Sequence, residues 1–112
     1  MEATARQKNI IMSPRKIRRV INTIRGKKVT DAYNILRLMP YSAAKVVLKN
    51  LIDATHNAKI KFGVEPEALQ VSSIYADGGR KFVRFKPRAQ GRVYKREKKT
   101  AHLTIKLTAL ES

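Results

Sequence analysis

The sequence predicts an α+β fold in which three helices pack on a small antiparallel sheet with a long, protruding, basic β-hairpin. Three observations lead to this prediction. Apolar residues recur with helical spacing between residues 14 and 62, and with the alternation of strands from residue 68 onward. Residues 80–99 contain ten bases and one acid but few apolar side chains, so this segment has little to bury in a core.

Three helices are predicted between residues 13 and 63. For the first, Ser13 is a good N-cap, Pro14 suits the first helical position, and Gly26 ends the helix. Thr30 is the predicted cap of the second helix, which Pro40 ends. The third runs from about residue 41 or 42 to residue 62 and has the widest apolar stripe. The three stripes are Ile17, Val20, Ile21 and Ile24; Ala32, Ile35, Leu36 and Met39; and Ala44, Val47, Leu48, Leu51, Ala58 and Phe62.

The remaining segments have the composition of strands. Residues 3–12 and 68–76 are predicted strands, and residues 101–109 alternate most regularly. In that last strand Leu103, Ile105 and Leu107 point one way, and His102, Thr104, Lys106 and Thr108 point the other way. Asp77-Gly78-Gly79 indicates a turn or a bulge, and we favour the turn.

The basic segment forms the arms of the predicted hairpin, which spans about residues 78–100. Its arms are residues 80–86 and 92–99, and residues 87–91 form the loop. An isolated two-stranded hairpin is marginal in water, although eight residues per arm reach roughly 26 Å. We therefore expect a β-finger that becomes ordered inside an RNA or DNA cavity. Phe82, Phe85 and Tyr94 either stack on bases or, as we favour, pack at the base of the hairpin.

Length and composition are those of a single domain over residues 1–112. Of the 112 residues, 43% are hydrophobic and 29% are charged, which favours a folded body. Cysteine is absent, so disulfides and thiolate metal sites are excluded. No apolar run approaches the roughly 20 residues of a membrane span, and no signal peptide is recognisable. We expect an intracellular, cytoplasmic protein with no membrane partner.

The net charge of +17 is concentrated at the two ends of the chain. Residues 1–28 hold nine bases and one acid, residues 29–79 hold five of each, and residues 80–112 hold eleven bases and two acids. Solubility needs a net charge of only about 2–8 in a small domain. Such an excess is better explained by neutralisation on the phosphates of a nucleic acid.

The candidate nucleic-acid-binding residues are the bases of the two charged segments. On the first helix, Arg15, Arg18, Arg19 and Arg25 lie opposite the apolar stripe, so we expect them to be dispensable for folding. The full set is Arg6, Lys8, Arg15, Lys16, Arg18, Arg19, Arg25, Lys27, Lys28, Arg80, Lys81, Arg84, Lys86, Arg88, Arg92, Lys95, Arg96, Lys98 and Lys99.

Catalysis is not expected from this sequence. His56 and His102 are the only histidines, and Asp53 and His56 lie at helical spacing without a third ligand or nucleophile nearby. We interpret them as a surface polar pair. The sequence therefore predicts no catalytic residue, metal site or cofactor.

Particular motifs nevertheless resemble a known family. They are SPRKIRRVINTIRGKKV at residues 13–29, Met-Pro at 39–40, DATHNA at 53–58, and DGGRKFVRFKPRAQGR at 77–92. Their order and spacing resemble the large-subunit ribosomal protein family L-twenty-two, in its bacterial form, along nearly the whole chain. Gly79-Arg80 and Gln90 depart from the residues usual at those positions.

The resemblance implies a structural protein of the large ribosomal subunit, in bacteria or in an organelle. It implies binding to several domains of the large ribosomal RNA, assistance in subunit assembly, and contacts with neighbouring ribosomal proteins. It also implies that Arg88, Ala89, Gln90 and Gly91 line the peptide exit tunnel and meet the nascent peptide. The alternative is a free nucleic-acid chaperone or DNA-binding regulator that uses the same basic surfaces.

Overall fold

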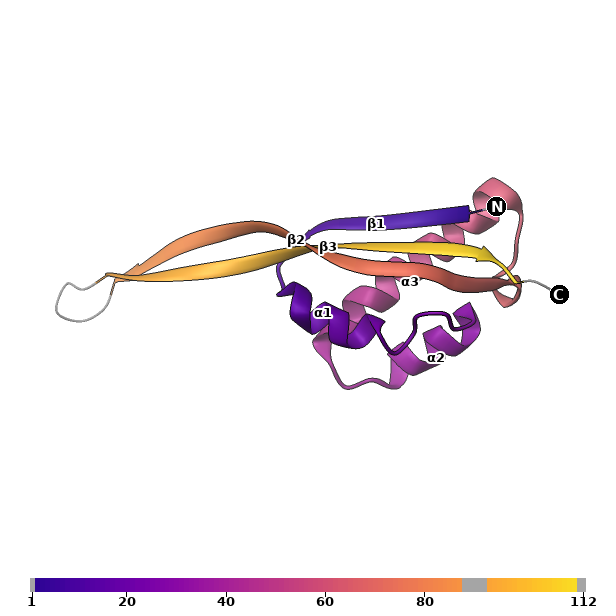
Figure 1. Ribbon diagram of the computed structural model, residues 1–112, viewed down its shortest axis with the longest axis horizontal. Coiled ribbons are helices and arrows are strands. Elements are labelled where there is room, and N and C mark those ends of the chain that lie inside the picture. Colours follow the sequence, from indigo (N-terminus) through magenta and orange to yellow (C-terminus); the bar gives the residue numbers. More distant parts are fainter. Residues whose placement is uncertain (1, 88–92, 111–112) are drawn as a thin grey trace.

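The computed structural model describes the backbone of residues 2–87 and 93–110 and the side chains of residues 2–79 and 99–110. All three helices lie on the same side of one antiparallel sheet with strand order β1-β3-β2, and the far parts of β2 and β3 extend beyond them as a narrow arm (Figure 1). The predicted fold class is confirmed. In chain order the elements are β1 (Glu2–Ile10), α1 (Pro14–Ile21), α2 (Val29–Leu38), α3 (Ser42–Phe62), a 3₁₀ turn (Pro66–Ala68), β2 (Leu69–Pro87) and β3 (Val93–Ala109).

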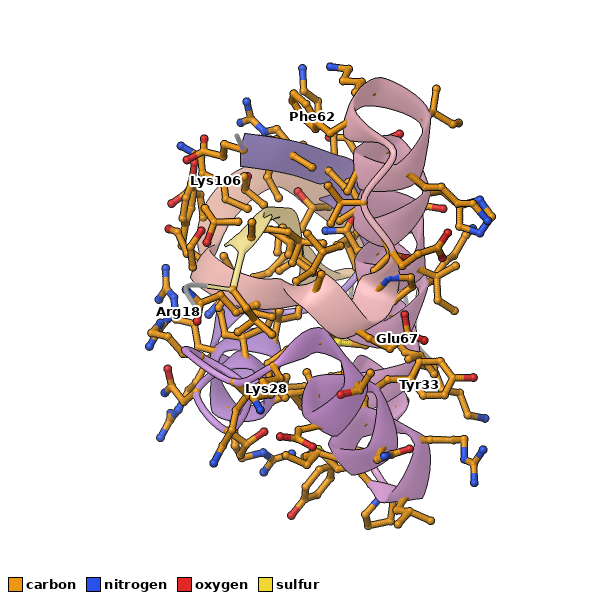
Figure 2. All side chains as sticks on the ribbon, turned by 90° about the vertical axis from the view of Figure 1, so that its right-hand side faces the viewer. Arg18, Lys28, Tyr33, Phe62, Glu67 and Lys106 are labelled. Carbon is orange, nitrogen blue, oxygen red and sulfur yellow. The ribbon has the colours of Figure 1, made fainter. Side chains whose placement is uncertain are left out.

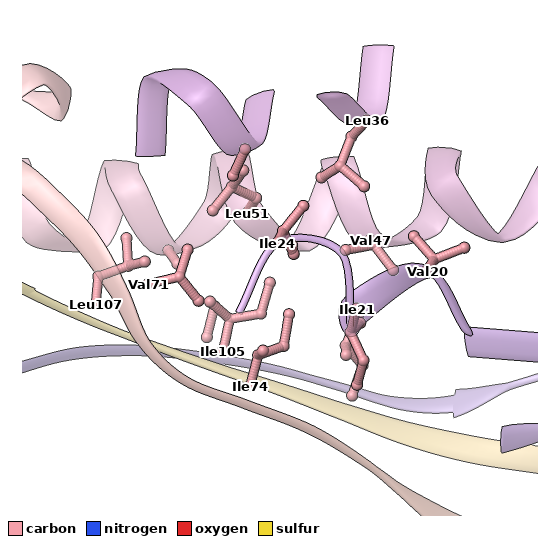
Figure 3. Close-up of a cluster of buried hydrophobic side chains, with 14 of the residues drawn as sticks. Val20, Ile21, Ile24, Leu36, Val47, Leu51, Val71, Ile74, Ile105 and Leu107 are labelled. Atoms are coloured by element: carbon pink, nitrogen blue, oxygen red, sulfur yellow. The ribbon is translucent and has the colours of Figure 1, made fainter. Parts of the chain in front are cut away.

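The central strand β3 supplies the middle of the core. Leu103, Ile105 and Leu107 alternate along it and are fully buried. Each such side chain contributes about 1.5–3 kcal/mol by leaving water. Figure 3 shows where helices and strands meet in this cluster, which includes Val20, Ile21, Ile24, Leu36, Val47, Leu51, Val71, Ile74, Ile105 and Leu107.

The polar face of β3 differs from the prediction at one position. His102, Lys106 and Thr108 are partly exposed, but Thr104 is only 3% exposed. Thr104 lies on the middle strand, opposite Arg6 of β1 and Tyr75 of β2. A short side chain in that position is covered because longer side chains flank it on both neighbouring strands.

Helix α1 is shorter than its apolar stripe predicted. It ends at Ile21 instead of Gly26, and residues 22–26 form turns. Ile24 is nevertheless fully buried, because the turns fold back onto the sheet. Gly26 adopts a φ of +77°, and its N–H donates to the Val71 carbonyl at 3.1 Å.

The other two helices follow the sequence closely. α3 begins at Ser42 and ends at Phe62, where Gly63 terminates it with a φ of +65°. Phe62 was predicted in the buried stripe but is 45% exposed. α2 begins at Val29, so Thr30 lies in its first turn and is not its cap.

Asp77-Gly78-Gly79 is not a turn. β2 continues through it without interruption, and the pairing with β3 shifts register between Gly78 and Lys81. The bulge alternative is therefore the correct one. β3 is likewise a single strand where two were predicted.

The two glycines at this bulge differ in how much space surrounds them. A Cβ added to Gly79 would lie 2.5 Å from Thr100 Oγ1 and 3.2 Å from two atoms of the His102 ring, whereas one added to Gly78 would meet nothing within 4 Å. The backbone at Gly79 therefore approaches β3 closely, and Thr100 is only 1% exposed.

We predict that Gly79→Ala lowers the free energy of unfolding by about 1–3 kcal/mol, because the new methyl group overpacks the base of the hairpin. Gly78→Ala is the matched control and should change it by less than about 0.5 kcal/mol. Urea denaturation followed by circular dichroism measures both. Equal effects of the two substitutions would contradict the close approach at Gly79.

Candidate nucleic-acid interface

Helix α1 separates apolar from basic residues as predicted. Ile17, Val20 and Ile21 are fully buried in the core. The opposite side of the helix lines an open hollow of about 650 Å³, formed by Arg15, Lys16, Arg18, Arg19 and Asn22. This hollow gathers four positive charges within one short helix.

Two of the predicted RNA-binding arginines also bind the outer edge of β2. Arg18 donates from Nε and Nη2 to the carbonyl oxygen of Ala76, at 3.1 and 2.9 Å. Arg25 donates from Nη2 to the carbonyl oxygen of Ile74 at 2.9 Å. These bonds fix both guanidinium groups in position. Because an arginine has five N–H donors, each group retains donors for a second partner.

Arg19 is oriented by an aromatic ring. Its guanidinium carbon lies 4.2 Å from the centroid of Tyr41, the residue that precedes α3. A cation–π contact of this kind contributes about 0.5–1 kcal/mol at an exposed site. The contact joins α1 to the start of α3 and keeps the Arg19 charge on the same surface as Arg15 and Arg18.

A second hollow, of about 310 Å³, lies where α1 meets the base of the hairpin. Its lining residues are Ser13, Pro14, Arg15, Arg18, Gly78, Gly79, Lys99 and Thr100. Because Arg15 and Arg18 line both hollows, the two form one surface. The two basic segments, separated in sequence by a neutral stretch, thus meet at Arg15, Arg18 and Lys99. We call this surface the α1–hairpin surface.

The other predicted bases of the N-terminal segment do not line either hollow. Lys27 and Lys28 are exposed and follow the outer edge of β2, where Lys28 pairs with Gln70. Arg6 is exposed on the sheet face opposite the helices, and Lys8 is exposed near the end of β1. Arg6 therefore does not belong to the α1–hairpin surface.

The backbone of the hairpin arms is paired over most of its length. Register places Lys81 opposite Lys99 and Arg84 opposite Arg96. Like charges at directly paired positions destabilise a sheet, so anions nearby would stabilise this arm. Arg80, Lys86, Lys95 and Lys98 also belong to the paired strands. Arg88, Ala89, Gln90, Gly91 and Arg92 lie outside the described residues.

Sequence reasoning missed the contacts that hold this region together. Nothing in the spacing of Arg18 and Arg25 showed that they would bond to a strand more than forty residues away. It also missed that the backbone N–H of Asn9 donates to Nδ1 of His102 at 3.1 Å. Asn9 has a φ of +58°, a conformation that asparagine tolerates better than most residues.

This architecture defines a class of protein. A folded body with a cationic surface that continues into a basic β-arm is typical of proteins that assemble with nucleic acid. Among the described residues, no helix is both long and apolar enough to cross a membrane.

Comparison with known proteins identifies the family. Residues 5–108 match the model of the family described as ribosomal protein L22p/L17e. The chain is 49% identical to the large ribosomal subunit protein uL22 of Acaryochloris marina, over 96% of this chain and 89% of that one. It is 47% identical to uL22 of Clostridium novyi, over 94% and 95% of the two chains. It is 46% identical to uL22c of Rhodomonas salina, over 95% and 90%.

The chain therefore belongs to the ribosomal protein L22p/L17e family. Membership confirms the resemblance seen in the sequence. It assigns the chain to the structural proteins of the large ribosomal subunit and not to the enzymes.

We predict that Arg18→Ala lowers the free energy of unfolding of the free protein by about 1 kcal/mol, because two hydrogen bonds to Ala76 are lost. Arg15→Ala removes the same charge from the same surface and should change it by less than about 0.5 kcal/mol. Urea denaturation distinguishes the two. A loss in Arg15→Ala as large as that in Arg18→Ala would mean that charge, and not the bonds to β2, sets the stability.

Proposed function

We propose that the protein binds large-subunit ribosomal RNA through the α1–hairpin surface and joins separate RNA segments during subunit assembly. The observation that carries this proposal is the meeting of the two basic segments at Arg15, Arg18 and Lys99. A surface shared by a helix and a protruding arm can contact RNA strands that approach from different directions. Family membership supports RNA of the large subunit as the target and neighbouring ribosomal proteins as further partners.

Phosphate neutralisation supplies most of the proposed affinity. The guanidinium of Arg18 is held by Ala76 and is presented to both hollows. A fixed guanidinium loses little entropy on binding and offers its remaining donors to phosphate oxygens. The exposed side chains of Arg15, Lys16 and Lys99 add charge around it.

The tip of the hairpin has a separate proposed role. We infer that Arg88, Ala89, Gln90 and Gly91 line the peptide exit tunnel and contact the nascent peptide, as the resemblance implies. The support is the shape of the chain: its longest dimension is 66 Å, and the paired arm of β2 and β3 leads away from the helices (Figure 1). Such an arm can reach a cavity that the body cannot enter.

A DNA-binding regulator has less support. A recognition helix must present its N-terminal residues to the major groove of DNA. The N-terminal end of α1 instead shares a hollow with Gly78, Gly79 and Lys99 at the base of the arm. The arm would therefore stand in the path of a duplex that approached this end of α1.

We predict a strong salt dependence for binding of the free protein to a large-subunit RNA fragment. Six or more phosphate contacts, at a slope of about −0.7 each, give a log–log slope of about −4 or steeper. Arg15→Ala with Lys16→Ala should make the slope shallower by about 1.4. Lys59→Ala with Lys61→Ala, at the far end of α3, is the charge-matched control. Filter binding between 50 and 300 mM salt measures all three, and a wild-type slope near −1 would refute phosphate neutralisation.

We predict that deletion of residues 88–91 leaves the body folded and able to enter large subunits, because α1 and the hairpin base remain. The deletion should change the response of translating ribosomes to peptides that stall in the tunnel. Ribosome profiling of a stalling reporter, with subunit content checked by sedimentation, measures both outcomes. Unchanged stalling in fully loaded subunits would remove the tunnel role and leave RNA binding intact.

A further inference from the structure

An apolar groove runs between α2 and α3, on the side of the body away from Arg18. In Figure 2, Tyr33 and Glu67 lie on one side of the molecule and Arg18 on the other. The groove has a volume of about 390 Å³, and none of its lining residues is charged. They are Val29, Thr30, Tyr33, Asn34, Leu51, Ile52, Thr55 and Pro66.

The groove continues into a smaller hollow of about 220 Å³ that shares Thr55 and Pro66 with it. Large apolar side chains remain exposed along both. Tyr33 and Ile52 are each 37% exposed, and Ile60 is 81% exposed. Apolar side chains that line a continuous groove, in contrast to scattered ones, indicate a surface that another molecule covers.

One end of the groove is acidic. Pro66 lines the groove, and Glu65 and Glu67 precede and follow it in the chain. Lys59, which lines the smaller hollow, has its Nζ 3.9 Å from Glu65. Two acids and one base therefore lie at this end, whereas the hollow on α1 is lined by four bases and no acid.

These properties disfavour RNA and favour a peptide. Acids repel phosphates, and a sugar–phosphate backbone gains little from apolar side chains. A peptide with one large aliphatic or aromatic side chain buries it in the groove, and lysine or arginine beside that side chain meets the acidic end.

We propose that the groove between α2 and α3 docks a short basic segment of a neighbouring ribosomal protein, with one large apolar side chain held among Tyr33, Ile52 and Pro66. The inference rests on the proposed function, which puts the chain in an RNA-rich particle. Proteins that neutralise RNA phosphates carry more basic than acidic residues, as this one does. A segment with the required positive charge is therefore available in such a particle. The cationic side of the body then contacts RNA, and the opposite side contacts protein.

Photo-crosslinking in assembled subunits tests the occupant. A photoreactive phenylalanine analogue is introduced at position 33, and separately at position 15, and large subunits that contain each chain are purified and irradiated. Position 33 should crosslink to a Lys/Arg-rich protein segment with a large apolar residue, and position 15 should crosslink to RNA. RNA, a second copy of this chain or no crosslink at position 33 overturns the inference while leaving RNA binding standing. A chain that does not enter subunits refutes the proposed function, and the inference with it.

The segment that crosslinks is then synthesised and titrated against the free protein. Tyr33→Ala and Ile52→Ala should each weaken binding about tenfold, and Glu67→Gln about two- to threefold. Tyr75→Ala is the matched control, because Tyr75 is 38% exposed on the far face of the sheet, and it should leave the affinity unchanged. Replacing the apolar residue of the peptide by alanine should have the same effect as Tyr33→Ala. Equal losses in the Tyr33 and Tyr75 variants would contradict a specific groove contact.

Discussion

The bonds between the end of α1 and the outer edge of β2 organise the rest of the molecule. An open strand edge exposes unpaired backbone groups and invites pairing with other chains. Here Arg18 and Arg25 donate to the carbonyls of Ala76 and Ile74, and Val71 exchanges backbone bonds with the loop at Gly26 and Lys27. These contacts protect the edge and hold the basic helix beside the base of the hairpin. The α1–hairpin surface exists because of them, so the guanidinium of Arg18 both supports the fold and lines this surface.

A well-packed body makes this concentration of charge tolerable. Repulsion among like charges, at a net charge of +17, destabilises the compact state. It is opposed by a core whose central strand is fully buried at Leu103, Ile105 and Leu107. The sequence of the hairpin arm contains few apolar residues, and its register pairs Lys81 with Lys99 and Arg84 with Arg96. An anion that binds only the folded protein adds to its stability by mass action. Packing therefore stabilises the body, whereas the binding of an anionic partner would add stability to the arm.

The sequence predicted the features that depend on local pattern and missed those that depend on distant partners. The limits of α3, the apolar side of α1 and the alternation along β3 follow from periodicity, and all were correct. The early end of α1 was missed because Gly26 pairs with Val71, far away in the sequence. Asp77-Gly78-Gly79 has the composition of a turn, but Gly79 lies in a strand because only glycine can approach Thr100 so closely. Burial of Thr104 depends on its neighbours in two other strands.

The candidate nucleic-acid interface and the groove also combine features that the local sequence predicts with features that depend on distant partners. Composition and charge identified the basic residues of the α1–hairpin surface, but not which of them also bond to β2. The apolar groove had no signal at all, because Tyr33 lies on α2, Ile52 on α3 and Pro66 in the following turn. Its position on the side opposite Arg18 has a consequence for assembly. Electrostatic attraction acts over roughly 8 Å at physiological salt, whereas apolar burial needs direct contact. If both proposals hold, RNA orients the chain first, and the groove binds a neighbouring protein only when that orientation has brought the protein against it.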